Sequence, residues 1–543
     1  MKQRFHRFLS LLLTLVFTLA FSAIAWAADV VILHTNDIHC GVEDNVGVAR
    51  LSQYKKDLKK QGLAVLLVDA GDAVQGAPIG KLSKGESIVN IMNAIGYDFL
   101  IPGNHEFDYG MEQFFRLNSL QKTKYFSCNF TDLRTGNLCL SPYKVVSAGG
   151  HKIAFVGVTT PETLATSTPK YFQDENGKFI YGFSEDNSGA KIYAAIQKAV
   201  DAAKAEGAEY VIVVGHLGVN GSIPKWSSIT IAENTRGVTA IIDGHSHEQF
   251  DTLMAKNKDG KDVLITQTGT KMQTVGKLVI HDDGTMTSTL EKEDTLPNPD
   301  PKNLKVIEKE NKKFEPILKQ TVGEALVDLC ERDPATGERR VRSQETNMGD
   351  FVADAFRAVL NTDIALVNGG SLRNKISKGV FTYQDILTAF PFGNMSSAVE
   401  VTGQTILDAL ELSAMNLPEE NGGFLQVSGL TYEIHTYIDT PCKQDENTLF
   451  AGIDGERRVQ NVLVNGKPID PKATYTLASH DYMLLNQGDG YSMFGGCKLL
   501  QDRVKLDNQV LIDYIVDTLG GTVGEQYDNP YGEGRIVIVE EKP

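Results

Sequence analysis

One pattern recurs through the first half of the chain: a short apolar run, rich in β-branched residues, that ends in a polar cluster. The runs occupy residues 30–35, 65–68, 99–101, 211–214 and 239–242. Helical stretches such as residues 190–205 lie between some of them. Strands that are apolar throughout are typical of sheets buried on both faces by other layers. The pattern therefore predicts a layered α/β domain.

The polar clusters combine histidines, carboxylates and an amide at the ends of these strands, where ligands gather in α/β folds. Asp37 and His39 stand two residues apart, as do His245 and His247, so in extended backbone both members of a pair point to the same side. Five of the chain's eleven histidines fall in these clusters. The full set is Asp37, His39, Asp72, Asn104, His105, Asp108, His216, His245 and His247. Such mixed donors favour Zn, Mn, Fe or Co over Mg or Ca, in a dinuclear hydrolytic centre.

Residues 291–320 break the pattern, because prolines at 297, 299 and 301 precede a charged, helix-like run. This composition is typical of a linker with a connecting helix. Helix signals at 348–360 and 404–415 and strand signals at 364–367, 425–434 and 475–478 follow. We therefore expect a catalytic domain over 28–290, a linker over 291–320 and a second, mixed α/β domain over 321–543.

Loops of the second domain carry arginines and aromatic residues. Arg342 precedes a helix, and Arg373 ends a glycine-containing turn after a strand. Arginine donates two parallel hydrogen bonds to phosphate or carboxylate groups. Residues 390–394 and 482–491 bring aromatic side chains that can stack on a base. Each feature taken alone is common in solvated loops or in cores.

The calcineurin-like metallophosphoesterases have a signature that this chain resembles in five places: Asp37-x-His39, Gly71-Asp72, Gly103-Asn104-His105-Glu106, Gly215-His216 and Gly244-His245-Ser246-His247. With its second domain, the chain resembles the secreted bacterial 5′-nucleotidase/UDP-sugar hydrolase family. The resemblance implies a layered α/β/β/α catalytic domain, a linker helix and a C-terminal mixed α/β domain for nucleotide recognition.

The same resemblance implies two divalent metal ions (Zn, Mn, Co or Fe) and a catalytic dyad. One ion would be held by Asp37, His39, Asp72 and His247, and the other by Asp72, Asn104, His216 and His245. Many family members have an amide at the position of His247. In the dyad, Asp108 would orient His105, which stabilises charge on the phosphoryl group and the leaving oxygen.

For the substrate, the resemblance implies phosphate- or carboxylate-binding arginines, polar contacts to the nucleoside and an aromatic clamp for the base. These roles fall on Arg342 and Arg373, on Asn368, Asn394 and Asp489, and on Phe392. The family's second clamp residue aligns with Met483, and Tyr482 stands next to it, so either can complete the clamp. A methionine there would predict a broader substrate range, because its side chain adapts its shape.

We therefore expect hydrolysis of nucleoside 5′-monophosphates to nucleoside and phosphate, extending to nucleoside di- and triphosphates and nucleotide sugars. One alternative is a 2′,3′-cyclic nucleotide 2′-phosphodiesterase/3′-nucleotidase, whose sequences carry closely similar motifs. Another is a non-catalytic exported protein that binds nucleotides. The net charge of −16, from 53 basic and 69 acidic residues, argues against a nucleic-acid polymer as partner. The oligomeric state stays open.

Residues 1–27 have the organisation of a secretory signal. Basic residues precede an apolar run over 8–25, and Ala-Trp-Ala follows at 25–27. We expect cleavage after Ala27, export to a periplasm or the exterior, and no stable membrane anchor afterwards. Six cysteines suit an oxidising compartment, and Cys128 and Cys139 are the expected local disulfide.

Overall fold

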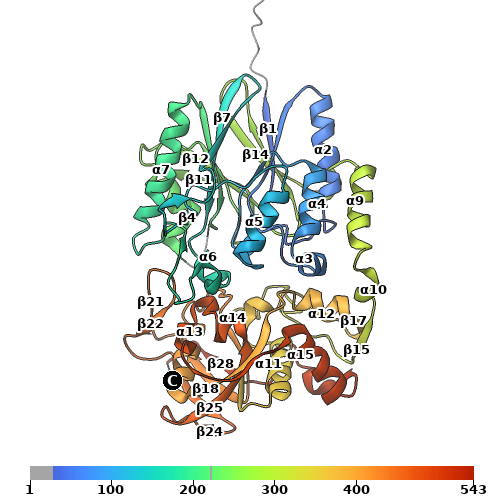
Figure 1. Cartoon of the computed structure of the whole chain (residues 1–543), viewed down its shortest axis with the longest axis vertical. Coiled ribbons are helices and arrows are strands. Elements are labelled where there is room, and N and C mark those ends of the chain that lie inside the picture. Colours follow the sequence, from blue (N-terminus) through green and yellow to red (C-terminus); the bar gives the residue numbers. More distant parts are fainter. Residues whose placement is uncertain (1–28, 220–222, 543) are drawn as a thin grey trace, which may run out of the picture.

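The computed structural model describes residues 29–219 and 223–542, so the expected signal at 1–27 lies outside the described residues. The chain forms two lobes stacked along the long axis of the molecule (Figure 1). The N-terminal half builds the upper lobe of this view and the C-terminal half the lower one.

The N-terminal domain contains two facing sheets. The first has the order β14-β13-β1-β2-β3 and comprises β1 (Val30–Thr35), β2 (Ala64–Asp69), β3 (Phe99–Leu100), β13 (Val275–Ile280) and β14 (Met286–Glu291). The second has the order β11-β12-β10-β9-β7-β6 and comprises β6 (Tyr143–Ala148), β7 (His151–Thr159), β9 (Tyr210–His216), β10 (Ala240–Ile242), β11 (Gln249–Lys256) and β12 (Asp262–Thr268). The central strands of each sheet are parallel, so their carboxyl ends share one edge.

Successive side chains of each strand point to opposite faces of its sheet, and together they form three apolar layers. On β1, Val30 and Ile32 face the other sheet, where they pack with Ile212, while Val31 and Leu33 face outward. Helices α2 (Val48–Lys60), α4 (Glu86–Ile95) and α5 (Met111–Leu120) cover the first sheet, and α7 (Ala190–Ala205) and α8 (Ser228–Asn234) cover the second. Because side chains of a strand alternate between faces, an apolar run of this kind must be covered on both sides. The predicted α/β/β/α layering is confirmed.

The segment between the domains contains two helices. After β14 the chain forms α9 (Pro301–Asn311) and α10 (Glu315–Leu318). The side chain of Asp300 caps α9 by accepting from the Lys302 amide, and Pro301 occupies the first turn. Helix α9 packs on α2 and α4 of the upper lobe, and α10 lies where the lobes meet (Figure 1).

The C-terminal domain is a mixed α/β fold, as predicted. Its main sheet, in the order β19-β16-β25-β18-β26, comprises β16 (Ile364–Asn368), β18 (Met395–Thr402), β19 (Leu425–Ser428), β25 (Thr474–His480) and β26 (Lys498–Leu506). Smaller sheets comprise β15 (Thr321–Ala325), β17 (Gly379–Thr382) and β27 (Thr522–Val523), and β20 (Leu430–His435), β23 (Val459–Val464), β24 (Lys467–Pro468) and β28 (Ile536–Val539). The helices are α11 (Asn347–Leu360), α12 (Tyr383–Ala389), α13 (Gly403–Ser413), α14 (Asp481–Leu484) and α15 (Asp507–Asp513).

Two short helices of the upper lobe face the lower one: α3 (Pro78–Ser83) and α6 (Thr163–Thr166) (Figure 1). Among the described residues, no helix combines the length and the apolar composition that a membrane span requires.

The expected disulfide is wrong, because Cys128 and Cys139 are both free thiols. Cys128 is buried in the core between the second sheet and α7, whereas Cys139 packs against the core of the first sheet. The two side chains, although close in sequence, therefore pack in different cores. Burial raises the pKa of each thiol to about 12, so neither is a reactive thiolate.

Candidate metal centre and substrate cavity

The predicted metal ligands lie at the shared carboxyl edge of the two sheets. Asp37 and Asp72 follow β1 and β2, Asn104 follows β3, His216 ends β9, and His245 and His247 follow β10. The two sheets face each other, so ligands from both converge on one place. The structure thus brings together residues that lie far apart in the chain.

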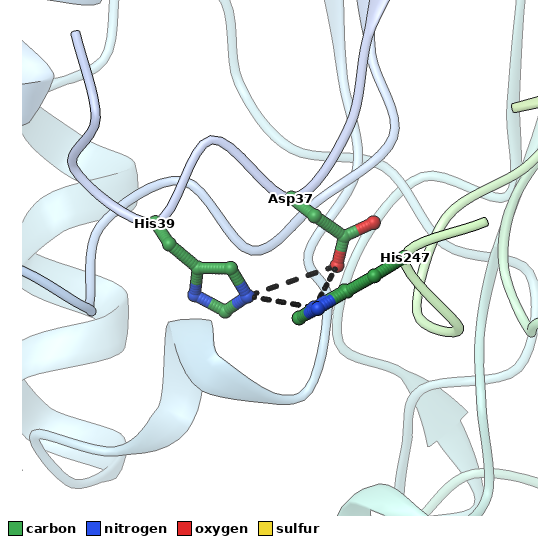
Figure 2. Close-up of side chains that lie close together, drawn as sticks. All are labelled: Asp37, His39 and His247. Atoms are coloured by element: carbon green, nitrogen blue, oxygen red, sulfur yellow. Dashed lines mark hydrogen bonds and ion pairs between the residues drawn. The ribbon is translucent and has the colours of Figure 1, made fainter. Parts of the chain in front are cut away.

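Asp37, His39 and His247 form the first cluster (Figure 2). Asp37 Oδ1 lies 3.3 Å from His247 Nε2 and 3.8 Å from His39 Nε2. The two Nε2 atoms are 3.0 Å apart, and both rings point toward the carboxylate. His39 Nδ1 lies 3.0 Å from the carbonyl oxygen of Gln75, which leaves Nε2 for the cluster. This is the arrangement of side chains that share one metal ion.

Asp37, Asp72 and His216 form the second cluster. His216 Nε2 lies 3.1 Å from Asp72 Oδ2 and 3.9 Å from Asp37 Oδ1. Asn104 Oδ1 completes this side, 3.2 Å from His216 Nε2 and 3.0 Å from His245 Nδ1. Asp72 Oδ2 is also 3.8 Å from His39 Nε2, so this oxygen lies between the two clusters.

Each carboxylate uses one oxygen for the protein and presents the other to the clusters. Asp37 Oδ2 accepts from Asn36 Nδ2 at 2.7 Å and from the His245 amide at 2.9 Å, while the buried Oδ1 has no hydrogen-bond partner. Asp72 Oδ1 accepts from the His105 amide at 2.8 Å. A buried carboxylate oxygen without a donor is costly, and a divalent cation removes that cost. The donor sets therefore fit two divalent metal ions bound through nitrogen and oxygen.

Five of the proposed metal ligands have positive φ angles, and a metal-binding role explains this backbone strain. Asp37, His39, Asp72, His245 and His247 have φ of 49°, 46°, 59°, 81° and 59°. Non-glycine residues seldom adopt positive φ, and such strain collects at functional sites. Gly103 is required nearby, since a Cβ there would lie 2.3 Å from Asp72 Oδ1.

Three buried carboxylates that the sequence analysis did not single out hold the ligands in place. Glu106 accepts from the amides of Asp72 at 2.8 Å and Gly103 at 2.6 Å, so it ties two ligand loops together. Glu162 Oε2 lies 2.7 Å from His245 Nε2, and a carboxylate in this position orients a ligating histidine. Asp243 accepts from the amides of residues 217 and 218 beside His216. Glu106 stands inside the motif Gly103-Asn104-His105-Glu106, and Asp243 directly follows β10. Their positions in the sequence could therefore have identified both as neighbours of the metal ligands.

His105 and Asp108 form the predicted dyad geometry. His105 Nδ1 lies 2.6 Å from Asp108 Oδ2, and Ser167 Oγ donates to Asp108 Oδ1 at 2.9 Å. Burial lowers the pKa of His105, but Asp108 and Asp72 together raise it by more, so the net pKa is above the usual value. The imidazolium form can donate from Nε2 to an oxyanion. That nitrogen lies 3.3 Å from Arg373 Nη2 of the other domain.

A cavity of about 1140 Å³ lies between the two domains, and its wall includes His105 and Asp108 of the dyad and the proposed ligands Asp72, Asn104, His245 and His247. Four arginines line it: Arg332, Arg339, Arg342 and Arg373. A binding role was predicted from the sequence for Arg342 and Arg373, but not for Arg332 and Arg339. Burial and the charges of Arg339 and Arg373 lower the pKa of Arg342 well below its ordinary value. Buried Nε atoms of Arg342 and Arg373 lack partners, so this wall of the cavity favours an anion.

The predicted nucleoside contacts line the same cavity, except for Met483. Asn368 Nδ2 donates to Asp489 Oδ2 at 2.5 Å, and Tyr482 Oη donates to Asp489 Oδ1 at 2.9 Å. Phe392 and Asn394 are also in the wall. The guanidinium of Arg373 lies 5.0 Å from the centroid of the Phe392 ring.

Met483 is fully buried in the core of the C-terminal domain, where its sulfur accepts from Ser479 Oγ at 3.7 Å. A residue of α14 that points into the core cannot also face the cavity, and the neighbouring Tyr482 faces it instead. The expected broader substrate range, which depended on a methionine in the clamp, loses its basis.

Comparisons with known proteins agree with this geometry. Residues 30–249 match the model of the calcineurin-like phosphoesterase family, and residues 322–496 match that of the 5′-nucleotidase C-terminal domain. The trifunctional nucleotide phosphoesterase protein YfkN of Bacillus subtilis is 27% identical over 94% of this chain, and the match spans 35% of the length of that relative. The 5′-nucleotidase of Vibrio cholerae is 28% identical, with 90% of this chain and 91% of that protein covered.

Among solved structures, a 5′-nucleotidase precursor of Thermus thermophilus superposes with a TM-score of 0.78. It is 27% identical and covers 95% of this chain and 100% of its own. One family match falls within each of the two domains that enclose the cavity. The chain therefore belongs to the family of metal-dependent phosphoester hydrolases in which a calcineurin-like phosphoesterase domain is joined to a 5′-nucleotidase C-terminal domain.

Proposed function

We propose that the protein hydrolyses nucleoside 5′-monophosphates to nucleoside and inorganic phosphate, and that it also accepts nucleoside di- and triphosphates and nucleotide sugars. One observation carries the proposal. Arg373 contacts His105 of the dyad on one side and lies over the Phe392 ring on the other. The phosphate end and the base end of a nucleotide therefore have adjoining places in a single cavity.

We assign one metal ion to Asp37, His39, Asp72 and His247, and the other to Asp72, Asn104, His216 and His245. The two side-chain clusters and the partnerless Asp37 Oδ1 support this assignment. When bound, such a pair of ions supplies a nucleophile from water and neutralises charge on the phosphoryl oxygens.

Side chains of the protein bind the phosphate group and stabilise the negative charge that develops on it. Arg342 and Arg373 hold the phosphate with parallel hydrogen bonds. His105, kept protonated by Asp108, donates from Nε2 to the oxygen on which negative charge develops. The hydrogen bond from Ser167 to Asp108 fixes the carboxylate that holds the imidazole.

The other end of the cavity recognises the nucleoside. Asp489 and Asn368 bond to each other, and Asn368 Oδ1 lies 3.0 Å from His480 Nε2, so their remaining lone pairs and protons have fixed directions toward the sugar. Phe392 and Tyr482 offer the faces between which a base stacks.

A substrate panel on the metal-reconstituted protein tests the proposal. We expect AMP to be turned over faster than 3′-AMP or 2′,3′-cyclic AMP, with UDP-glucose also hydrolysed. A cyclic diester hydrolysed much faster than AMP would instead favour the phosphodiesterase/3′-nucleotidase alternative. A wild type inert with every metal would favour a non-catalytic nucleotide-binding protein. His105→Ala serves as the control, and full phosphate release by that variant would contradict the role of the dyad.

We further propose that the activity lies outside the cytoplasm, since residues 1–27 have the organisation of a secretory signal. Sequencing of the exported protein from its N-terminus tests this, with residue 28 expected first.

A further inference from the structure

A lysine of the catalytic domain crosses to the domain that recognises the nucleoside. Lys81 lies in α3, and its side chain is only 12% exposed. Its Nζ is 3.6 Å from Oδ1 of Asp507, a fully buried carboxylate of the C-terminal domain, and it has no hydrogen-bond partner. The lysine stem packs directly on Gly393, where a Cβ would lie 2.7 Å from Lys81 Cε. A buried ammonium with a single carboxylate opposite depends strongly on that carboxylate.

Asp507 in turn supports the loop that carries Phe392. Its Oδ2 accepts from the Asn394 amide at 2.7 Å, and its own amide donates to the Asn394 carbonyl at 2.8 Å. The next amide, of Met395, donates to Asp481 Oδ1 at 2.9 Å. Asp507 thus fixes the backbone two residues beyond Phe392.

The other half of the clamp also contacts the catalytic domain. Tyr482 Oη lies 3.1 Å from the carbonyl oxygen of Ala165 in α6. This is a separate contact, made by a different element, and it shows that both aromatic residues of the clamp are held from the catalytic side.

We propose that Lys81 is a positioning residue for the nucleobase: through Asp507 it fixes the loop on which Phe392 faces the base. Lys81 does not line the cavity, so it acts without touching substrate. The inference rests on the proposed function, because it supposes that a nucleoside occupies the clamp. It adds that base recognition requires a cation from the domain that performs the hydrolysis.

The test compares a substrate with a base and one without. In Lys81→Met, kcat/KM for AMP should fall roughly fivefold to tenfold, a part of what loss of a stacking aromatic costs, and the change should lie in KM. Ribose 5-phosphate, which has no base, should be hydrolysed with unchanged kcat/KM. Lys59→Met, at an exposed position of α2, is the matched control and should behave as wild type.

A double-mutant cycle shows whether the effect passes through the clamp. In a Phe392→Ala background, Lys81→Met should add no further loss for AMP, because the ring that it positions is gone. Asp507→Asn is the second variant: its oxygen accepts from the Asn394 amide while the charge opposite Lys81 is removed, and its NH₂ group replaces the oxygen that accepts from the Asn508 amide. It should reproduce the selective loss. Adenosine affinity of the metal-free protein, measured by calorimetry, should weaken by a similar factor.

Equal losses for AMP and ribose 5-phosphate in both variants would show a purely structural role and overturn the inference. So would an unchanged KM for AMP, or full additivity with Phe392→Ala. These results would leave the proposed function intact, since wild-type turnover of AMP is measured in the same series. A wild type that hydrolyses ribose 5-phosphate as well as AMP would overturn the nucleotide specificity and this inference together.

Discussion

Glu106 has the most constrained environment of the buried carboxylates around the metal centre. Its two oxygens accept from the amides of residues 72, 73 and 103 at 2.6–2.8 Å. Burial raises the pKa of Glu106, and these amide donors oppose the rise. The loops that it joins carry Asp72 and Asn104, so this residue holds together two of the residues proposed to bind the second metal ion.

We expect Glu106→Gln to weaken metal binding by about tenfold to a hundredfold, the range found when groups that orient metal ligands are removed. A glutamine side chain has one acceptor oxygen, and its NH₂ group would face backbone N–H donors. Titration of the metal-free protein with Mn²⁺ or Co²⁺ by calorimetry measures the effect. Glu112→Gln, on the exposed side of α5, is the control. Wild-type affinity in Glu106→Gln would contradict the role.

Ser167 contacts the dyad through Asp108, so it is one residue further from the proposed substrate than Asp108 is. Its hydroxyl is buried and donates to Asp108 Oδ1, while Asp108 Oδ2 holds His105. Ser167→Ala should lower kcat for AMP roughly tenfold, or about 1.4 kcal/mol, close to the value of a hydrogen bond to a charged group. KM should stay unchanged. Steady-state kinetics decide the matter, with the exposed Ser119→Ala as reference; an unchanged kcat would remove Ser167 from the machinery.

The short α6 segment contacts three parts of the proposed site. Glu162 lies before it and contacts His245, Ala165 contacts Tyr482, and Ser167 follows it and contacts Asp108. One short stretch of chain therefore touches a proposed metal ligand, the proposed base clamp and the proposed dyad. No periodicity or motif marks these residues, because their partners come from distant strands and from the other domain.

This contrast explains what the sequence predicted and what it did not. Strands such as β1 and β9 were predictable because a strand with apolar side chains on both faces is stable only where other layers cover both faces. The residues at their ends followed from the shared edge of parallel strands. The sequence did not decide whether Tyr482 or Met483 completes the base clamp, since neighbours on a short helix differ only in the direction that their side chains face. The Cys128–Cys139 pairing failed because it depended on which core each residue enters.

In the C-terminal domain, a buried ionic network joins α11 to the segment before β28. Asp350 is 1% exposed, and its Oδ1, 3.4 Å from Arg535 Nε, has no hydrogen-bond partner. Arg535 donates hydrogen bonds from both Nη atoms to the carboxylate of Asp354, and the carboxylate of Glu345 also lies nearby. Burial, aided by the carboxylates of Glu345 and Asp354, raises the pKa of Asp350 to about 8 against the opposing charge of Arg535.

The sign of the pH dependence follows from this shift. The folded state keeps the proton of Asp350 up to about pH 8, whereas the unfolded chain loses it near pH 4. The folded state therefore binds more protons across this window, and the contribution of Asp350 to stability falls as pH rises from 4 to 8. Asp350→Asn should raise Tm at pH 8 by roughly 2–4 °C and have little effect at pH 4. Calorimetric scans at both pH values test this; an equal shift at the two would contradict it.

The cavity between the domains brings charges of both signs together in a protein whose net charge is −16. Four arginines and seven carboxylates line it, so the attraction for an anion is confined to the wall that the arginines form. Fields from distant surface carboxylates are screened within about 10 Å at 0.1 M salt, so an anionic group that reaches this wall is acted on mainly by the nearby arginines. An acidic protein can thus bind a small anionic substrate while its surface repels long polyanions.

Metal removal tests how far the fold of the catalytic domain depends on its ions. Its three apolar layers are formed mainly by strands and helices rather than by the ligand loops, as with Ile32 in β1, Ile212 in β9 and Ile196 in α7, so the domain should stay folded without metal. Dialysis against a chelator should abolish hydrolysis of AMP and lower Tm by a few degrees, because ions that bind only the folded state stabilise it. Far-ultraviolet circular dichroism should be unchanged, and Mn²⁺ or Co²⁺ should restore activity. Loss of secondary structure on chelation would instead show that the ions are structural, because the buried carboxylates of Asp37 and Asp72 would then repel each other with no cation between them.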